Sequence, residues 1–398
     1  MEAPSVLRNA EFSLGDLQAR ARAVATIAAN NAVDVDNASR FPAEAVTALK
    51  EQRLLGIAVS RDLGGESAGI ADVADVCYLL GQSCSSTAMI YAMHQIKVAC
   101  VTRHLRDNTV LANLMRRLCT EQLLLASSTT EGQAGGNVRS SEAPVEYADD
   151  RISLERKASV ISYGAYADGI VTTARRSAEA AGTDQVLVAF LRDDYTLTRL
   201  QGWNTLGMRG TCSEGYTLKA QGVAGQILPD AYELIHAQTM VPFAHLLWGS
   251  VWTGIAAGAT ARAQAFIRQA MRASNGQLPP GAPQFTKALQ TLRTLRGMLA
   301  NSLRAYEIRM SDPKAIAAVD FQSLITLTKV EASELAVSVV MSAMRACGLS
   351  GYRSDGDFTI GRYLRDVLSS PIMINNDRIL ANLANSSLMT PIPTSMRD

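Results

Sequence analysis

The spacing of apolar residues changes twice along the chain. Between residues 12 and 123 apolar positions recur every three or four residues, as at Ala21, Val24, Ala25 and Ala28. This period is typical of helices that bury one face. The first part of the chain is therefore predicted to be a set of packed helices.

The middle of the chain has a different pattern. Short apolar runs at 123–128, 169–174 and 185–191 are rich in aliphatic residues and threonine, and polar or glycine-containing breaks separate them. Such runs are typical of β-strands. Residues 124–228 are therefore predicted to form a small sheet.

The helical period returns after residue 230 and lasts to the end of the chain. Its long runs are 240–273, 285–310, 313–346 and 372–387. The order of elements predicts an α+β fold with an N-terminal helical domain (1–123), a central β-sheet domain (124–228) and a C-terminal helical domain (229–398).

One stretch, residues 237–261, contains no Asp, Glu, Lys or Arg and is long enough to span a bilayer. Gln238, Pro242 and Ser250 interrupt it, and no basic cluster flanks it. We therefore interpret it as a helix buried in the core, and we expect no membrane contact.

Composition excludes further classes. Of 398 residues, 47% are hydrophobic and 19% are charged, as in folded globular proteins. The 38 basic residues barely exceed the 37 acidic ones, which argues against nucleic-acid binding. The 6 cysteines and 4 histidines lack the spacing of metal ligands, so no metal site is expected. Scattered single cysteines suit a reducing compartment, and a cytoplasmic location is expected.

Standard catalytic signatures are missing. The chain contains no P-loop, no GxGxxG after a predicted strand, no HExxH and no GxSxG elbow. An organic cofactor is therefore the better hypothesis, because cofactors supply chemistry that side chains lack.

Five segments then carry a resemblance to a known family. They are LLGIAV at 54–59 with LGG at 63–65, TTEGQAGGN at 129–137, LGMRGTCS at 206–213, GLSGY at 348–352 and RYLRD at 362–366. In this order and at these distances they resemble motifs of the acyl-CoA dehydrogenase superfamily, a group of flavin-dependent enzymes. The resemblance implies the family's three-domain fold, with a four-helix bundle in the C-terminal domain, and bound FAD.

The resemblance also implies which residues contact the flavin. It places Thr129 and Thr130 against the isoalloxazine ring, and Ile161 and Ser162 in the segment next to flavin N5. Ser162 stands where the family has threonine. Val160 stands where the family has a tryptophan that packs on the flavin, so the ring has a different neighbour here.

Two arginines correspond to positions that bind the FAD pyrophosphate or adenine across a subunit interface in the family. Arg272 lies in a segment similar to the family's RxxFG, and Arg345 replaces a glutamine three residues before Gly348. A guanidinium group can bind a phosphate through two hydrogen bonds. The resemblance therefore implies a homodimer or homotetramer in which Arg272, Arg345 and Gly348 contribute to cofactor binding.

The catalytic base of the family is absent. Ile374 or Asn375 occupies the position of the usual glutamate, and Asn375 is retained only as a cofactor contact. The alternative position, near the start of the long helix after residue 240, also lacks a glutamate. Asp377, two or three residues further on, and His245 are the replacement bases that we consider, and His94 is expected to lie near the flavin.

The resemblance and the missing glutamate leave two possible reactions and one non-catalytic function. The first is α,β-dehydrogenation of an acyl thioester, on coenzyme A or a carrier protein, by hydride transfer to flavin N5, with an electron-transfer partner or oxygen as acceptor. The second is a monooxygenase of the same fold, which uses reduced flavin from a donor, forms a C4a-hydroperoxide and needs no α-proton base. The missing glutamates favour the second, yet the first, the dehydrogenase, is the function predicted here and the second is its alternative. The third is a non-catalytic homologue.

Overall fold

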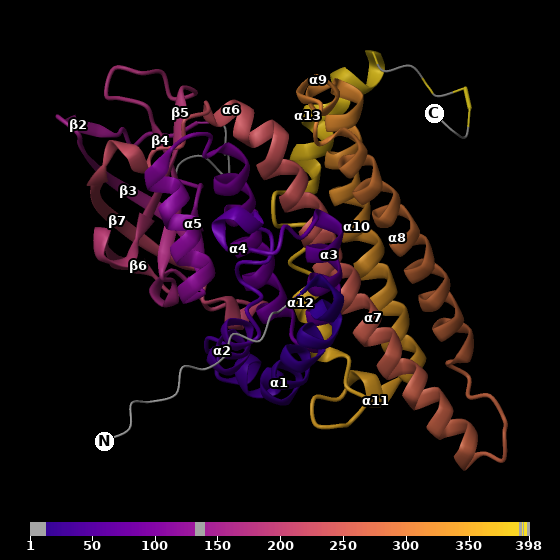
Figure 1. The fold of residues 1–398 in the computed structure, drawn as a ribbon. Helices are drawn as coiled ribbons and strands as arrows, with labels where there is room; N and C mark the ends of the chain where they lie inside the picture. The colour runs from indigo at the N-terminus through magenta and orange to yellow at the C-terminus, as the bar shows by residue number, and fades with distance from the viewer. Residues whose placement is uncertain (1–12, 132–139, 390–391, 393, 396–398) are drawn as a thin grey trace, which may run out of the picture.

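The computed structural model describes residues 13–131, 140–389, 392, 394 and 395. Its first part is helical, with η1 (Leu14–Asp16), α1 (Leu17–Asn37), α2 (Ala43–Glu51), η2 (Arg61–Leu63), α3 (Ile70–Ser83), α4 (Ser85–His104) and α5 (Thr109–Glu121). The last part is helical as well (Figure 1). The predicted α+β fold class is confirmed.

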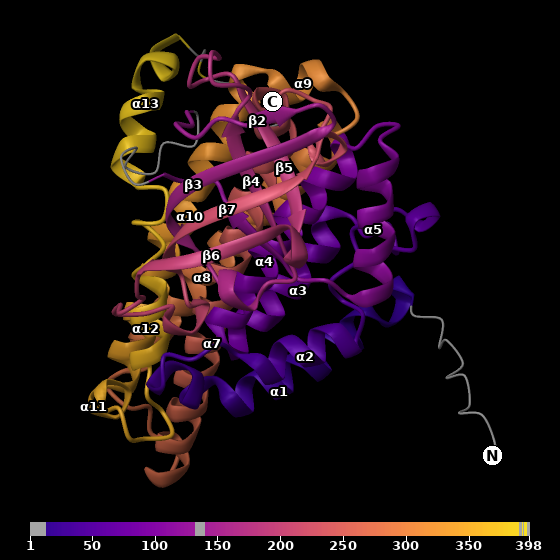
Figure 2. The same ribbon diagram turned by 90° about the vertical axis from the view of Figure 1, so that its left-hand side faces the viewer.

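Two small sheets form the middle of the chain. The strands are β1 (Leu125–Ser128), β2 (Glu146–Ala148), β3 (Arg151–Ile161), β4 (Gly169–Arg175), β5 (Gln185–Leu191), β6 (Tyr195–Gln201) and β7 (Glu214–Val223). One sheet has the order β1-β4-β5 and the other β2-β3-β7-β6, and Figure 2 shows β3, β7 and β6 crossing in front of α4. β1 pairs in parallel with β4, whereas the remaining pairs are antiparallel.

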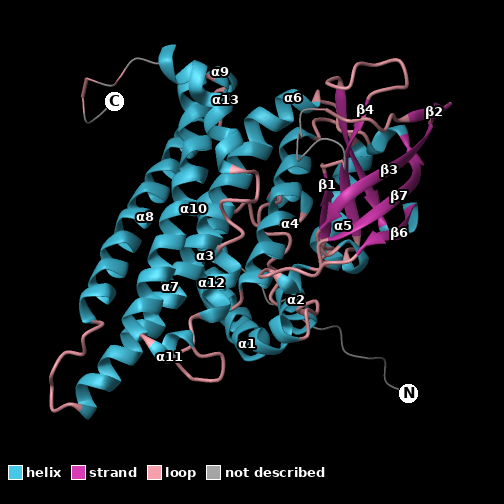
Figure 3. Ribbon diagram, turned by 180° about the vertical axis from the view of Figure 1, so that it is seen from behind, coloured by secondary structure: helices cyan, strands magenta, loops and turns pink. Residues whose placement is uncertain are grey.

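The C-terminal helices form a long bundle. They are α6 (Tyr232–Ile235), the π-helical η7 (His236–Met240), α7 (Val241–Ala273), α8 (Ala282–Arg309), α9 (Pro313–Ala317), α10 (Val319–Cys347), α11 (Leu349–Tyr352), α12 (Gly361–Val367) and α13 (Asn376–Met389). Figure 3 shows α3 and α4 between the sheets on one side and α7, α8 and α10 on the other.

The apolar stretch 237–261 lies at the centre of this arrangement. It belongs to the continuous helical run Tyr232–Ala273, whose most apolar window is 89% buried. Gly254 lets α7 approach α3 closely, since a Cβ atom there would lie 2.3 Å from the carbonyl oxygen of Tyr78. The burial agrees with the interpretation of this stretch as a core helix.

Two predicted helices have different bounds. The run 313–346 is divided at Ala318, which is extended (φ −61°, ψ 137°), and the Gln322 amide donates to the Ile316 carbonyl at 2.7 Å near this break. The run 372–387 becomes helical only at Asn376. Periodicity does not reveal such breaks, because apolar residues can still face the core across them.

The segment 205–213, here called the junction turn, connects the three parts of the chain. The Met208 N–H donates to Asp366 Oδ1 of α12 at 2.7 Å, and the Arg365 guanidinium donates to the Leu206 carbonyl at 3.0 Å. Arg365 also pairs with Asp36 of α1. The sheet region, the first helices and the C-terminal helices therefore meet at one turn.

This geometry predicts that Gly207→Ala destabilises the fold strongly. A Cβ atom at Gly207 would lie 2.1 Å from the Arg365 carbonyl oxygen. Relieving this clash would require the backbone of α12 to move. We expect a loss of about 1–3 kcal/mol or more in the free energy of unfolding, measured by chemical denaturation. Gly297→Ala in α8 is the control, because nothing lies within 4 Å of a Cβ atom there. Equal stability of the two variants would contradict the packing described.

Candidate active site

Hydroxyl groups from two distant segments share one surface. The segment that follows β1 runs beside β3, since Glu131 pairs with Ala158 in an isolated bridge. The hydroxyl oxygens of Ser159 and Thr130 are 3.5 Å apart, and Thr129 and Thr130 are half-buried. The remaining residues of the 129–137 motif, from 132 onward, lie outside the described residues.

Ser162 follows the end of β3 and lies in contact with the junction turn. Its Oγ is 2.8 Å from Ser213 Oγ, which is 2.7 Å from Thr211 Oγ1, and Thr211 Oγ1 donates to the Met208 carbonyl at 2.8 Å. Ile161 beside it is fully buried and anchors the strand end. Two sequence motifs therefore converge on one row of hydroxyls.

Tyr163 fixes the backbone around Ser162. It has a positive φ of 45°, its N–H donates to the Thr211 carbonyl at 2.8 Å, and its hydroxyl donates to the Leu125 carbonyl at 3.0 Å. Burial raises the pKa of Tyr163 well above its ordinary value, so the hydroxyl stays protonated as a donor.

The donor set at this surface fits a flavin better than a metal. Hydroxyl groups of Thr129, Thr130 and Ser162 match the nitrogen and oxygen atoms at the edge of an isoalloxazine ring, which both accept and donate hydrogen bonds. Val160, 36% exposed, adds an apolar contact. Within residues 13–131 and 140–389 no group of three His, Cys, Asp or Glu side chains could hold a metal ion.

A buried ion pair holds the threonine segment in place. Glu131 accepts the Glu142 N–H at 2.6 Å, and one of its oxygens lies 3.6 Å from Arg156 Nε. The Arg156 guanidinium donates to Thr173 Oγ1 at 2.7 Å, and burial lowers its pKa. The sequence analysis missed this pair. The position of Arg156 among alternating polar residues of β3 gave no signal that it points inward.

A second buried cation organises the segment before α13. Lys329 of α10 donates from Nζ to the carbonyls of Ile374 at 2.7 Å and Ser370 at 3.2 Å, and to Asn376 Oδ1 at 2.7 Å. Burial lowers the pKa of Lys329 to about 8. The Asn376 amide donates to Glu334 at 2.7 Å, which completes the network. The helical pattern of 313–346 did not single out this lysine.

Asn375 and Asp377, two of the residues considered at or near the family's glutamate position, face solvent. Asn375 is exposed and its Oδ1 accepts the Arg378 N–H at 3.1 Å, as a helix N-cap does. Asp377 is exposed in the first turn of α13. Neither side chain is held in an apolar pocket within this chain.

His245 lies inside the bundle, on the part of α7 that packs against α10. It is 4% exposed, and among the described residues its Nδ1 has no hydrogen-bond partner. Burial, followed by the nearby Lys329 charge, lowers the pKa of His245 to about 3. An imidazole with this pKa is neutral and weakly basic near pH 7.

We expect His94 near the flavin from the sequence. In the structure both of its ring nitrogens bind backbone groups. Its Nδ1 accepts the Leu125 N–H at 3.0 Å, so the proton sits on Nε2, which donates to the Leu55 carbonyl at 2.8 Å. Burial lowers the pKa of His94 to about 4. Both ring nitrogens are thus used to join α4 to β1 and to the loop after α2.

The two arginines lie on helices of the C-terminal bundle and not on the strand region that carries Thr129, Thr130 and Ser162. Arg272 and Arg345 are exposed at the C-terminal ends of α7 and α10, close to α11 at one end of the bundle (Figure 1). Gly348 has a φ of +56°, which favours glycine. No residue of the described chain forms a salt bridge with either arginine.

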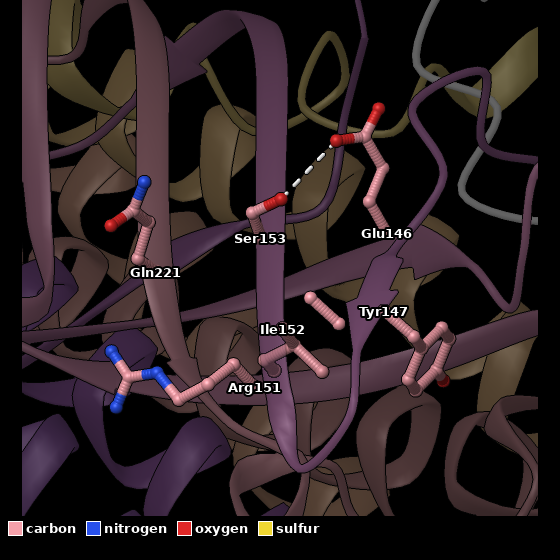
Figure 4. Close-up of a pocket in the computed structure, with 7 residues that line it drawn as sticks. Glu146, Tyr147, Arg151, Ile152, Ser153 and Gln221 are labelled. Atoms are coloured by element: carbon pink, nitrogen blue, oxygen red, sulfur yellow. Dashed lines mark hydrogen bonds between the residues drawn. The ribbon is translucent and has the colours of Figure 1, made fainter.

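A surface pocket of about 310 Å³ lies elsewhere, at the β2–β3 hairpin (Figure 4). It is lined by Tyr147, Arg151 and Gln221, and Ser153 donates to Glu146 at 3.2 Å on its rim. None of the predicted site residues lines it, so it does not bear on the hydroxyl surface.

The depressed pKa of His245 predicts an acid-sensitive stability. Its folded-state pKa of about 3 lies below the ordinary 6.5, so between these values only the unfolded state binds the proton, and stability falls as the pH falls. His245→Leu removes this contribution. We expect the loss of unfolding free energy between pH 7 and pH 4 to shrink by about 3 kcal/mol relative to the unaltered chain. An equal loss in both proteins, measured by denaturation, would contradict the assignment.

Sequence comparisons place the chain beside coenzyme A dehydrogenases. A family model described as the acyl-CoA dehydrogenase N-terminal domain matches residues 15–108. Cyclohex-1-ene-1-carbonyl-CoA dehydrogenase of Geobacter metallireducens is 24% identical over 91% of this chain and 94% of its own length. A probable acyl-CoA dehydrogenase of Mycobacterium leprae is 23% identical over 94% of this chain and 95% of its own length.

Solved structures share the fold at low identity. The FMN-bound dibenzothiophene monooxygenase TdsC of Paenibacillus sp. A11-2 superposes with a TM-score of 0.83 and 17% identity, covering 95% of this chain and 98% of that one. A nitrososynthase from Micromonospora carbonacea var. africana has a TM-score of 0.79 and 19% identity, covering 95% and 96%. The N-terminal family match and the curated relatives support the acyl-CoA dehydrogenase superfamily that the motifs resemble, and the solved structures share the fold.

Proposed function

We propose that the chain is a flavin-dependent oxidoreductase that binds its flavin ring on the hydroxyl surface of Thr129, Thr130 and Ser162. Two observations support the proposal: the Thr130 hydroxyl lies 3.5 Å from that of Ser159 on β3, and Ser162 follows the end of the same strand. The FMN named in the TdsC structure supports it as well. A bound flavin supplies a hydride acceptor or, when reduced, a means of activating oxygen. The chain's part is to hold the ring and to place its reactive edge.

The residues divide this task between them. Thr129 and Thr130 would donate to the ring, and Glu131 keeps them in register with β3 through its pairing with Arg156. Ser162 would lie at the reactive nitrogen, held by Ser213. Ile161 and Val160 would give apolar contact, while Asn375 would approach from the segment that Lys329 anchors.

The reaction that the geometry supports best is monooxygenation. One observation carries this proposal: neither family position for the base offers a basic group, because Asn375 is an exposed cap and His245 is buried with a pKa of about 3. Removal of an α proton needs a base within reach of it. Oxygen activation by a reduced flavin does not. The chain would then receive reduced flavin from a separate donor protein.

The curated relatives favour a second candidate. They are named as coenzyme A dehydrogenases and match more than nine-tenths of this chain. In this reading the substrate is an acyl thioester on coenzyme A or a carrier protein, an electron-transfer partner reoxidises the flavin, and Asp377 is the base. Asp377 is exposed in the isolated chain, so a partner subunit or the substrate would have to bury it.

Two assays separate these reactions. With reduced flavin, ¹⁸O₂ and indole or dibenzothiophene as probes, we expect the label in the organic product. Cyclohex-1-ene-1-carbonyl-CoA added without oxygen should leave the flavin absorbance unchanged. Rapid anaerobic bleaching would overturn the monooxygenase proposal.

If bleaching occurs, Asp377→Asn should slow it at least 100-fold, since a general base contributes about that factor. Asp320→Asn, an exposed aspartate in the first turn of α10, is the matched control. A protein that binds neither FAD nor FMN would instead point to a non-catalytic homologue.

The cofactor proposed is FAD, bound with help from a second subunit. The exposed arginines Arg272 and Arg345 would bind its pyrophosphate, and Gly348 leaves room beside them. Exposed apolar residues elsewhere in the C-terminal part suit burial in a homodimer or homotetramer: Ile308 on α8, Leu349 and Tyr352 on α11, and Ile372 in the turn before α13. A soluble, cytoplasmic enzyme is the proposal that agrees with the burial of the apolar helix.

Arg345→Ala tests this cofactor assignment. Loss of a charged phosphate contact should weaken FAD binding at least tenfold, because such hydrogen bonds are worth about 1.5–3 kcal/mol. FMN lacks the adenylate half, so its affinity should not change. Arg304→Ala, an exposed arginine of α8, is the control. Fluorescence titration that shows equal losses for FAD and FMN would exclude the proposed contact.

A further inference from the structure

Lys97 is a buried cation for which the described part of the chain supplies no carboxylate. It lies on α4, is 3% exposed, and forms no ion pair with another described residue. Its Nζ donates to Met240 Sδ at 3.6 Å, and a thioether sulfur is a weak acceptor. An ammonium group has three protons, so this contact leaves most of its hydrogen-bonding capacity unused.

Arg156 is a second buried cation near Lys97. Its Nη1 donates to the carbonyl and the hydroxyl of Thr173, but Nε and Nη2 have no hydrogen-bond partner among the described residues. Glu131 lies 3.6 Å from Arg156 Nε, and both Glu131 oxygens accept backbone N–H groups. The single charge of Glu131 can therefore balance Arg156 but not Lys97 as well.

The two cations share one interior region between α4, β3 and the π-helical η7. α4 packs against β1 and η7, and β1 also packs against β3 (Figure 3). Burial, with a contribution from the Arg156 charge, lowers the pKa of Lys97 to about 8. The Arg156 charge also opposes the upward shift that burial causes in the pKa of Tyr232, whose hydroxyl donates to Met240 Sδ at 3.3 Å. Lys97, Arg156 and Tyr232 are thus close enough to act on one another.

This region is rich in hydrogen-bond donors and poor in acceptors. On β1, which contacts both α4 and β3, the fully buried Ser128 hydroxyl also has no partner among the described residues. Burying a charge costs free energy unless an opposite charge and hydrogen bonds accompany it. Residues that break this rule without compensation inside the fold are expected at functional sites.

We propose that Lys97 and Arg156 bind the charged group of a small organic monoanion, of which a carboxylate is the simplest case, and that this anion is the substrate of the flavin site. Two positive charges against the one negative charge of Glu131 leave a single positive charge, which one carboxylate neutralises. The unused donors of Lys97 and Arg156 match its two oxygens.

The position along the chain connects this anion site with the proposed flavin surface. Ser128 and Glu131 directly flank Thr129 and Thr130, the two residues proposed to contact the flavin ring. The identity of the anion as substrate therefore rests on the proposed function, whereas its binding to the two cations does not depend on the reaction that the flavin performs.

The first test is a comparison of carboxylates with amides of the same shape. The probes for the full chain are acetate, butyrate and benzoate beside acetamide, butyramide and benzamide, and calorimetry without turnover gives the dissociation constants. We expect a carboxylate to bind about tenfold or more tightly than its amide, because hydrogen bonds between charged groups are the stronger ones. Equal affinity for each pair, or binding of no probe, overturns the inference and would mean that water alone solvates the two cations.

The second test is Lys97→Met, which keeps an unbranched side chain and removes the charge. The unpaired charge is a cost in the protein without its anion, so the free energy of unfolding should not fall, while the preference for carboxylates should be lost. The control is Lys50→Met, because Lys50 already pairs with Asp168 at 2.7 Å, and this variant should keep the preference. A less stable Lys97→Met protein, or an unchanged preference in it, overturns the inference.

Measuring FAD and FMN binding in the same preparation separates this result from the proposed function. A chain that binds flavin but does not prefer carboxylates contradicts the anion site alone. A chain that prefers carboxylates but binds neither flavin contradicts the proposed function, and with it the role of the anion as substrate.

Discussion

The hydrogen bond from the Met208 N–H to the buried Asp366 carboxylate is the contact on which the site depends. Burial raises the pKa of Asp366, and the nearby Arg362 charge opposes this shift. A buried carboxylate is costly unless its oxygens are hydrogen-bonded. The backbone of the junction turn therefore has one favourable position against α12, and the hydroxyls of Thr211 and Ser213 take their places from it.

Several buried polar side chains of the protein join segments of the chain, and their hydrogen bonds do not suit them to proton transfer. His94 uses both nitrogens to join backbone groups, Lys329 uses its three protons on the segment before α13, and Arg156 pairs with Glu131. These three groups are buried, and each joins segments that are distant in the chain. The surface proposed for the flavin offers hydroxyls and an apolar residue, which suit a ring with mixed hydrogen-bond donors and acceptors.

The asparagines near the position of the missing glutamate have structural roles, but neither of them can act as a base. Of the two residues considered for the family's position, Ile374 and Asn375, the second caps α13, and the adjacent Asn376 turns inward to Lys329. Asparagine at both positions allows the chain to satisfy a helix N-terminus and a buried ammonium in consecutive residues. A carboxylate is not required for the fold here, and a reaction without a base is accordingly compatible with it.

The sequence by itself determined the α+β class, the order of helices and strands, the burial of the apolar helix and the resemblance to a family, because these follow from periodicity and from motifs of contiguous residues. It also identified Ser162 and the 206–213 motif separately. Only the tertiary structure brought them into one row with Thr211 and Ser213, showed Arg156 and Lys329 to be buried, and placed Asp377 in solvent. The physical reason is that a side chain's partners and its exposure are set by contacts between segments far apart in the chain, and local patterns do not contain that information.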